Sequence, residues 1–137
     1  MKKDISFAVA LSALGNPGDR FMPGYKEDRS AAEMFALAAA AGITGLEFVH
    51  GRDITDENAG EIKGYMDKYG LKCCDVLPNL FSRKEFIRGS ISSRDPAVVE
   101  KASGEIRRAI DITKRLGGSL VNIWPGQDGY DYPFEAD

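Results

Sequence analysis

Four short apolar segments alternate with three amphipathic ones along the chain, and this order constrains the fold more than any single motif. The apolar segments are expected strands over residues 5–11, 45–49, 71–77 and 120–124. The amphipathic segments are expected helices over residues 31–41, 55–69 and 96–116. Strands that are continuously apolar and separated by amphipathic helices are typical of a parallel sheet covered by helices. The pattern therefore predicts an α/β fold with parallel strands and outer helices.

Local signals mark where several of these elements should begin or end. Ser30 is followed by Glu33 at the spacing of a capping box, which suits the start of the first helix. Thr55 is the expected N-cap of the second helix. Asp95 precedes a proline, the preferred residue at a first helical position, and so predicts the start of the third helix. Pro78 is expected to break the third strand.

Two parallel architectures fit this order of elements: a doubly wound open sheet, or half of a (β/α)8 barrel. A dinucleotide site would need Gly-x-Gly-x-x-Gly between the first strand and its helix, and residues 15–18 lack that spacing. A small flavodoxin-like binding domain also lacks a phosphate-cradling loop there. A whole barrel takes about 250 residues. Periodicity alone does not choose between an open sheet and a half-barrel.

Composition argues against several classes of function. The net charge of −3 and the dispersed basic residues disfavour a nucleic-acid partner, which needs clustered Lys and Arg. No segment approaches a membrane span of about 18 apolar residues, and none has the apolar core of a signal peptide. We therefore expect a cytoplasmic protein without a membrane partner. Cys73 and Cys74, the only cysteines, are expected to be reduced and buried.

Polar and aromatic residues follow the expected strands at the edge where parallel α/β folds bind ligands. His50, the only histidine, ends the second strand, and Asp53 lies close enough to orient an imidazole for proton transfer. Phe81 and Trp124 stand at the next two strand exits, where aromatic rings suit the apolar face of a sugar. Taken singly, the histidine also fits an ordinary hydrogen-bonded loop residue, and each aromatic ring fits the core.

The carboxylates near His50 do not by themselves make a catalytic or metal centre. Glu47 lies three residues before His50 and is expected on the opposite face of the strand, as an ion-pair partner or a polar group of a barrel interior. A metal site needs at least three ligands held together. The chain offers one histidine and scattered carboxylates, so no metal ligand is assigned.

In combination, these residues resemble the N-terminal half of the xylose isomerase-like TIM barrels, the superfamily of sugar isomerases and sugar phosphate isomerase/epimerases. The resemblance spans nearly the whole chain and keeps the family's order. Its four features are His50-Gly-Arg-Asp53, Asn79-Leu-Phe81 with its continuation to Asp95, the helix through Arg108-Ala-Ile-Asp111, and Trp124 followed by Gly126 and Gly129.

The resemblance implies that residues 1–137 are a (β/α)4 unit, the N-terminal half of a (β/α)8 barrel, with the C-terminal half absent. It implies a sugar or sugar phosphate isomerase or epimerase that depends on a divalent metal (Mn, Mg, Co or Zn). His50 would assist ring opening with Asp53 orienting it, while Phe81 and Trp124 would wall the substrate pocket. The metal ligands would come mostly from strands five to eight, outside this chain.

Departures from the family pattern bear on the substrate. Pro125 stands in place of the first glycine after the tryptophan, residues 51–52 replace acidic ones, and Ala10 lies where a tryptophan is expected. Another sugar, a sugar phosphate or a glycoside is therefore a better expectation than xylose. The related endonuclease branch uses several histidine ligands, which a chain with one histidine does not provide.

A half-barrel leaves its first and fourth strands as open edges. We therefore expect the isolated chain to be inactive, and to form a homo-oligomer or to pair with the missing half. The alternative is a non-catalytic (βα)4 module that assembles with itself or with a partner chain.

Overall fold

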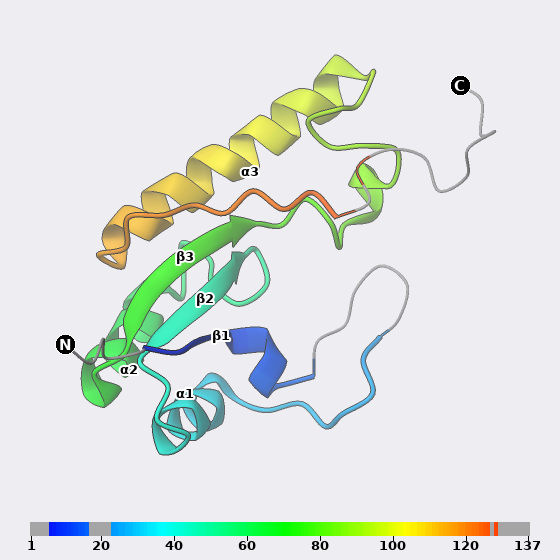
Figure 1. The fold of residues 1–137 in the computed structure, drawn as a ribbon. Helices are drawn as coiled ribbons and strands as arrows, with labels where there is room; N and C mark the ends of the chain where they lie inside the picture. The colour runs from blue at the N-terminus through cyan, green and yellow to red at the C-terminus, as the bar shows by residue number, and fades with distance from the viewer. Residues whose placement is uncertain (1–5, 17–22, 127, 129–137) are drawn as a thin grey trace.

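A parallel sheet with helices packed against it is the frame of the chain (Figure 1). The structure, a computed structural model, describes residues 6–16, 23–126 and 128. Its elements in chain order are β1 (Ala8–Ala10), η1 (Leu11–Leu14), α1 (Ala31–Ala40), β2 (Gly45–His50), α2 (Ala59–Tyr69), β3 (Lys72–Pro78), η2 (Lys84–Phe86) and α3 (Pro96–Arg115). The three strands pair in the order β1-β2-β3, and both pairings are parallel. The predicted α/β fold with parallel strands is therefore confirmed.

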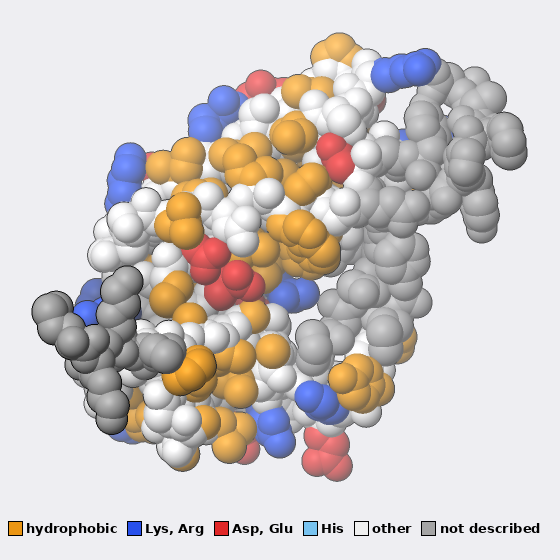
Figure 2. Space-filling model, in the orientation of Figure 1, with side chains coloured by type: hydrophobic (Ala, Val, Ile, Leu, Met, Phe, Trp, Pro, Cys, Tyr) orange, Lys and Arg blue, Asp and Glu red, His pale blue; other side chains and the backbone are white. Residues whose placement is uncertain are grey.

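The helices cover one face of the sheet. Leu46 and Phe48 of β2 are completely buried, and so is Val76 of β3. They share one core cluster with Phe35 of α1 and Ile112 of α3, and α2 contributes to the same cluster. Figure 2 shows the other face, where acidic side chains gather over the middle of the sheet among apolar ones. The two faces of the sheet thus have different chemistry.

Two helices begin where the sequence predicts. The Glu33 N–H donates to Ser30 Oγ at 3.3 Å, and the Ser30 N–H donates to the Glu33 carboxylate at 2.8 Å, which completes the capping box. Asp95 Oδ1 accepts from the Ala97 N–H at 2.8 Å, with Pro96 at the first helical position. Both starts are set by residues within one helical turn, so they could be predicted from the local sequence.

Two predicted boundaries are wrong. The strand β1 is shorter than residues 5–11, because the chain turns into η1 at Leu11; residues 1–5 lie outside the described part. Thr55 is not the N-cap of α2: it exchanges hydrogen bonds with Asn58 in a turn, and Asn58 precedes the helix. The strand β3 ends at Pro78 as predicted, with the proline itself as its last residue, paired with His50.

The fourth expected strand is present as a single pairing. Val121 bridges Val76 in parallel, with hydrogen bonds from the Val76 N–H to Leu120 O at 3.3 Å and from the Asn122 N–H to Val76 O at 3.1 Å. The prediction is right in position and direction but wrong in length. About half of Leu120 and of Trp124 is exposed, so the side chains of this segment are only partly packed against the rest of the molecule.

A β-bulge in β3 sets the register of the sheet. Leu46 pairs with Cys73, whereas the next residue, Glu47, pairs with Asp75, so Cys74 is the extra residue. The expectation that both cysteines are buried is wrong for Cys74, which is exposed. Cys73 is partly buried, and that burial, helped by Asp75, raises the pKa of its thiol to about 12.

The packing of α3 on the sheet provides a test of this fold. Ile112 is fully buried, whereas Ile110 on the same helix keeps 36% of its surface exposed. We expect Ile112→Ala to lower the free energy of unfolding by roughly 2–5 kcal/mol, because it removes buried apolar contacts and leaves a cavity. Ile110→Ala should cost clearly less. Urea denaturation of the two variants measures the difference, and equal losses would contradict this placement of α3.

Candidate functional site

His50 ends β2 and faces the helix layer. Its side chain lies on the same side of the strand as Phe48, and the residue is only 4% exposed. The ring nitrogen Nδ1 lies 3.0 Å from Glu105 Oε2 of α3. The other nitrogen, Nε2, is buried and has no hydrogen-bond partner among the described residues. The histidine is thus held by a helix carboxylate, with one polar atom left unpaired.

The buried carboxylate of Glu105 is the centre of an ionic cluster whose two arginines reach the surface. Its Oε1 accepts from Arg83 Nη1 at 2.8 Å and from Arg108 Nη2 at 2.6 Å, while Oε2 contacts His50. Burial acts to raise the pKa of Glu105, but the hydrogen bond from Arg108, the charge of Arg83 and the contact with His50 together hold it below its ordinary value. The carboxylate is therefore ionised at neutral pH. Glu105 is not among the site residues predicted from the sequence.

Asp53 does not make the predicted contact with His50. Its Oδ2 accepts from the Val49 N–H at 2.8 Å, and its Oδ1 lies 3.5 Å from Arg52 Nε. Burial raises the pKa of Asp53, although the Val49 hydrogen bond and the charge of Arg52 oppose that shift. The carboxylate thus folds the loop after β2 back onto the strand. The expected contact between Asp53 and His50 is therefore not formed, and that expectation is wrong. The catalytic roles of both residues remain predictions.

Arg52 joins the loops that follow three successive strands. Its Nη2 donates to Ser12 Oγ at 2.7 Å, in η1. Its guanidinium carbon lies 5.6 Å from the centre of the Phe81 ring, a cation–π distance. Its Nε lies beside Asp53. The sequence marked Arg52 only as a departure from the family pattern, and the structure places it in the middle of the strand exits.

Phe81 and Trp124 lie against each other, while their role as walls of a substrate pocket stays a prediction. Their ring centroids are 4.9 Å apart, with 54° between the ring planes. Trp124 is 55% exposed, so the pair is open to solvent on one side. Asn79 Oδ1 fixes the loop before Phe81 by accepting from the Ser82 N–H and hydroxyl. The segment after Trp124 passes so close that a Cβ on Gly126 would lie 2.9 Å from Phe81 Cβ.

On the face opposite His50, Glu47 and Asp75 form a carboxyl pair. They are register partners of β2 and β3, and a side-chain hydrogen bond joins them. Desolvation raises the pKa of Glu47, and the charge of Asp75 adds to it. Desolvation also raises the pKa of Asp75, against hydrogen bonds from Asn122 and Glu47. The predicted orientation of Glu47 is confirmed, but its partner is a second acid rather than a cation.

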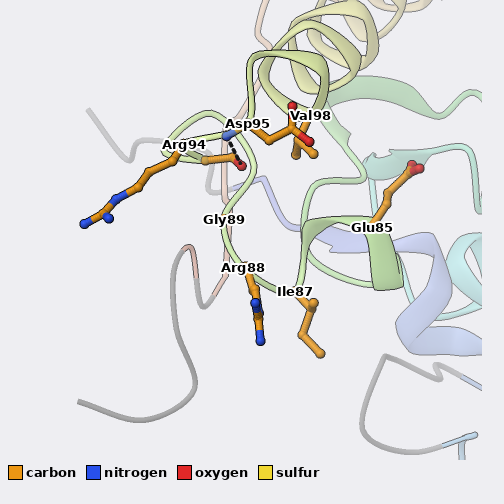
Figure 3. A pocket seen from close by; sticks show the side chains of 8 residues that line it. Glu85, Ile87, Arg88, Gly89, Arg94, Asp95 and Val98 are labelled. Carbon is orange, nitrogen blue, oxygen red and sulfur yellow. Dashed lines mark hydrogen bonds between the residues drawn. The ribbon is translucent and has the colours of Figure 1, made fainter. Parts of the chain in front are cut away.

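Two hollows lie near these loops. One, of about 190 Å³, is at the exits of β1 and β2, where Ser12, Arg29, Arg52 and Asp53 contribute to its wall. The other, of about 290 Å³, lies between the loop after η2 and the start of α3 (Figure 3). Its two arginines, Arg88 and Arg94, point in different directions, so they do not converge on one anion.

Neither a metal centre nor a membrane span is found in the described part of the chain. Within residues 6–16, 23–126 and 128, no three His, Cys, Asp or Glu side chains are grouped so that they could hold a metal ion. The helices of the same residues lack the length and apolarity needed to cross a bilayer.

The carboxyl pair predicts a pH-dependent stability. Because the pKa of Glu47 is raised in the folded state, its favourable contribution is present below the unfolded pKa and is lost as the pH rises through the folded pKa. Glu47→Gln cannot ionise, so its stability relative to the wild type should increase as the pH rises above about 4.5. Urea denaturation from pH 4 to 8 measures this. A stability difference between Glu47→Gln and the wild type that stays constant over this range would contradict the assignment.

Comparison with known proteins agrees with this arrangement. The family described as Xylose isomerase-like TIM barrel matches residues 35–137. The xylose isomerase of Fervidobacterium gondwanense is 31% identical over 127 residues, covering 80% of this chain and 29% of that protein. The xylose isomerase of Mesorhizobium japonicum is 32% identical over 116 residues, covering 78% of this chain and 26% of that protein. The chain thus spans less than a third of the length of these relatives.

A solved structure supports the fold. The crystal structure of an AP endonuclease of family 2 from Brucella melitensis matches with a TM-score of 0.56 at 20% identity, over 85% of this chain and 39% of that one. At this identity the likeness concerns the fold alone. Because the family match covers most of the chain and the sheet is parallel with helices on its outer face, the chain belongs to the xylose isomerase-like TIM barrel family and forms part of such a barrel.

Proposed function

We propose that this chain is part of a sugar or sugar phosphate isomerase or epimerase and supplies one wall of its substrate pocket. The observation that carries the proposal is the Phe81–Trp124 pair, whose rings meet at 4.9 Å. The pair follows the carboxyl ends of parallel strands, where barrel enzymes bind substrates. The half-exposed Trp124 ring, backed by the less exposed Phe81, can pack against the C–H face of a sugar, whose hydroxyls are then left for polar neighbours such as Arg52.

In this proposal His50 handles a proton during ring opening. Its Nε2 is a buried polar atom without a partner among the described residues, and such atoms require a hydrogen-bonding group. Nε2 would accept the proton of the anomeric hydroxyl while the bond from C1 to the ring oxygen breaks. The proton then passes to that ring oxygen, which leaves an open-chain carbonyl and a neutral histidine. Asp53 would support the step by holding the loop that carries Arg52.

The proposed enzyme uses a divalent metal, Mn, Mg, Co or Zn, which would supply charge stabilisation at the substrate oxygens. The described residues do not gather a ligand set for such an ion, so the steps assigned to this chain do not involve it. We assign the ligands to a part of the protein outside this chain. Both cysteines are free thiols, which supports a cytoplasmic location.

The single tryptophan makes the proposed pocket directly observable. Trp124 emission should change when D-xylose, D-fructose or D-fructose 6-phosphate binds, because the sugar would cover an exposed indole. Phe81→Ala should weaken the apparent affinity roughly 2- to 12-fold, the equivalent of an aromatic contact worth about 0.5–1.5 kcal/mol. Fluorescence titration measures both effects.

The matched control is Phe7→Ala, which removes an exposed phenylalanine next to β1 and should leave the affinity unchanged. An emission that no sugar alters, or equal effects of the two variants, would contradict the pocket. With Mn²⁺ or Mg²⁺ present, we expect no turnover by the isolated chain. Clear turnover would overturn the assignment of the metal ligands to another part of the protein.

A second candidate function is a non-catalytic half-barrel that assembles with a second copy. It is favoured by apolar side chains along the segment that bridges β3: Leu120, Ile123 and Trp124 are 56%, 47% and 55% exposed. If this segment pairs between copies, Ile123→Lys should shift the chain from dimer to monomer in sedimentation velocity at micromolar concentration. Ile87→Lys, at a similarly exposed isoleucine elsewhere, should not. A wild-type monomer under these conditions would exclude this candidate.

A further inference from the structure

We propose that Glu105 is the positioning residue of His50: its carboxylate fixes the ring as the tautomer with hydrogen on Nδ1 and leaves Nε2 as the acceptor. This inference rests on the proposed role of His50 in ring opening. It moves the orienting function from the loop after β2 to the helix α3, 55 residues further along the chain. The residues that carry it are His50, Glu105, Arg83 and Arg108.

The two oxygens of Glu105 have different partners, and this decides the tautomer. An ionised carboxylate can only accept hydrogen bonds, so the proton in the 3.0 Å contact must belong to His50 Nδ1. A neutral imidazole has one N–H, and the other nitrogen is then an acceptor. The second oxygen of Glu105 is occupied by the two arginines, so the carboxylate cannot rotate without breaking both contacts. The ring orientation and the tautomer are therefore set together.

The surrounding charges keep Glu105 in the form that this role needs. The residue is 2% exposed, and a lone buried carboxylate would tend to protonate. Arg108 on the same helix and Arg83 before η2 outweigh that tendency and lower the pKa of Glu105. From a third element, Glu57 in the turn before α2 interacts electrostatically with the histidine. The acceptor facing Nδ1 is thus ionised at neutral pH.

Asp53 cannot share the role in this geometry. Its carboxylate is occupied by the Val49 N–H and lies beside Arg52. Moving it to His50 would leave a buried backbone N–H unpaired, which costs about 1–3 kcal/mol. Asp53 and Glu105 are therefore a natural pair of test sites, because both carboxyls are buried and only one contacts the ring.

The test reads the tautomer of the only histidine by ¹⁵N NMR, with two-bond correlations from the ring hydrogens. In the wild-type chain, at a pH where the ring is neutral, we expect Nδ1 to carry the hydrogen and Nε2 to be bare. Glu105→Gln should give a mixture of tautomers, because the amide can both donate and accept. Asp53→Asn should keep the wild-type pattern. Hydrogen on Nε2 in the wild type, or a tautomer change in Asp53→Asn alone, would overturn the proposal.

A second measurement separates positioning from a purely structural role. The sugar that changes Trp124 emission most is added to each sample, and the Nε2 shift should move in the wild type and in Asp53→Asn but much less in Glu105→Gln. If Trp124 responds and Nε2 does not, Glu105 is only structural and the inference fails. If no sugar affects Trp124, the proposed function fails, whereas the sugar-free tautomer still reports on Glu105. The tautomer of His50 in the wild-type chain is measured without any variant. That test therefore remains valid even if Glu105→Gln does not fold.

Discussion

The parallel pairing of β2 with β3 is the interaction on which the rest of the site depends. It places His50 opposite Pro78, so the two strands reach their carboxyl ends together and their exit loops begin at the same edge. The bulge at Cys74 shifts this pairing by one residue after Leu46. Because side chains alternate along a strand, a ladder without the bulge would pair Glu47 with Cys74, and Asp75 and Val76 would exchange faces, with the acid toward the core. One extra residue thus sets both the core and the polar inner face.

The acids on the two faces of the sheet have pKa shifts in opposite directions. On the helix side, Glu105 has two arginines and a histidine, and its pKa is lowered. On the inner face, Glu47 has Asp75 beside it, and the pKa values of both are raised. A compensated carboxylate can serve as a fixed acceptor, whereas an uncompensated acid pair costs stability when both groups ionise. The carboxylate on the helix side is therefore suited to holding a histidine ring in place. The acid pair on the inner face would be stabilised by additional polar or cationic neighbours.

The parts of the fold that could be predicted are those whose cause is local. The Ser30 capping box and the Asp95 cap act within three residues of the helix starts, and each is present in the structure. The length of the fourth strand depends on how the segment pairs with neighbouring strands, and the residues of the segment alone do not determine that pairing. The bulge at Cys74 depends on how two whole strands align, so alternation within one strand could not reveal the exposure of that thiol.

For the site, the sequence pattern placed Phe81 and Trp124 at neighbouring strand ends but did not predict that the rings touch, and the contact of His50 could not be found by looking three residues ahead. The missed signal is alternation along β2. Phe48 faces the helices, so His50 two residues later faces them as well, and its partner must come from a helix packed on the sheet.

On α3, Glu105 is four residues before Ala109 and so lies on the same buried face. A buried acid at that spacing, on an otherwise apolar stripe, requires hydrogen-bonding or cationic partners, and a polar side chain at the facing strand end is one candidate. The same reasoning explains why Asp53, beyond the end of the strand, is free to bind the backbone instead.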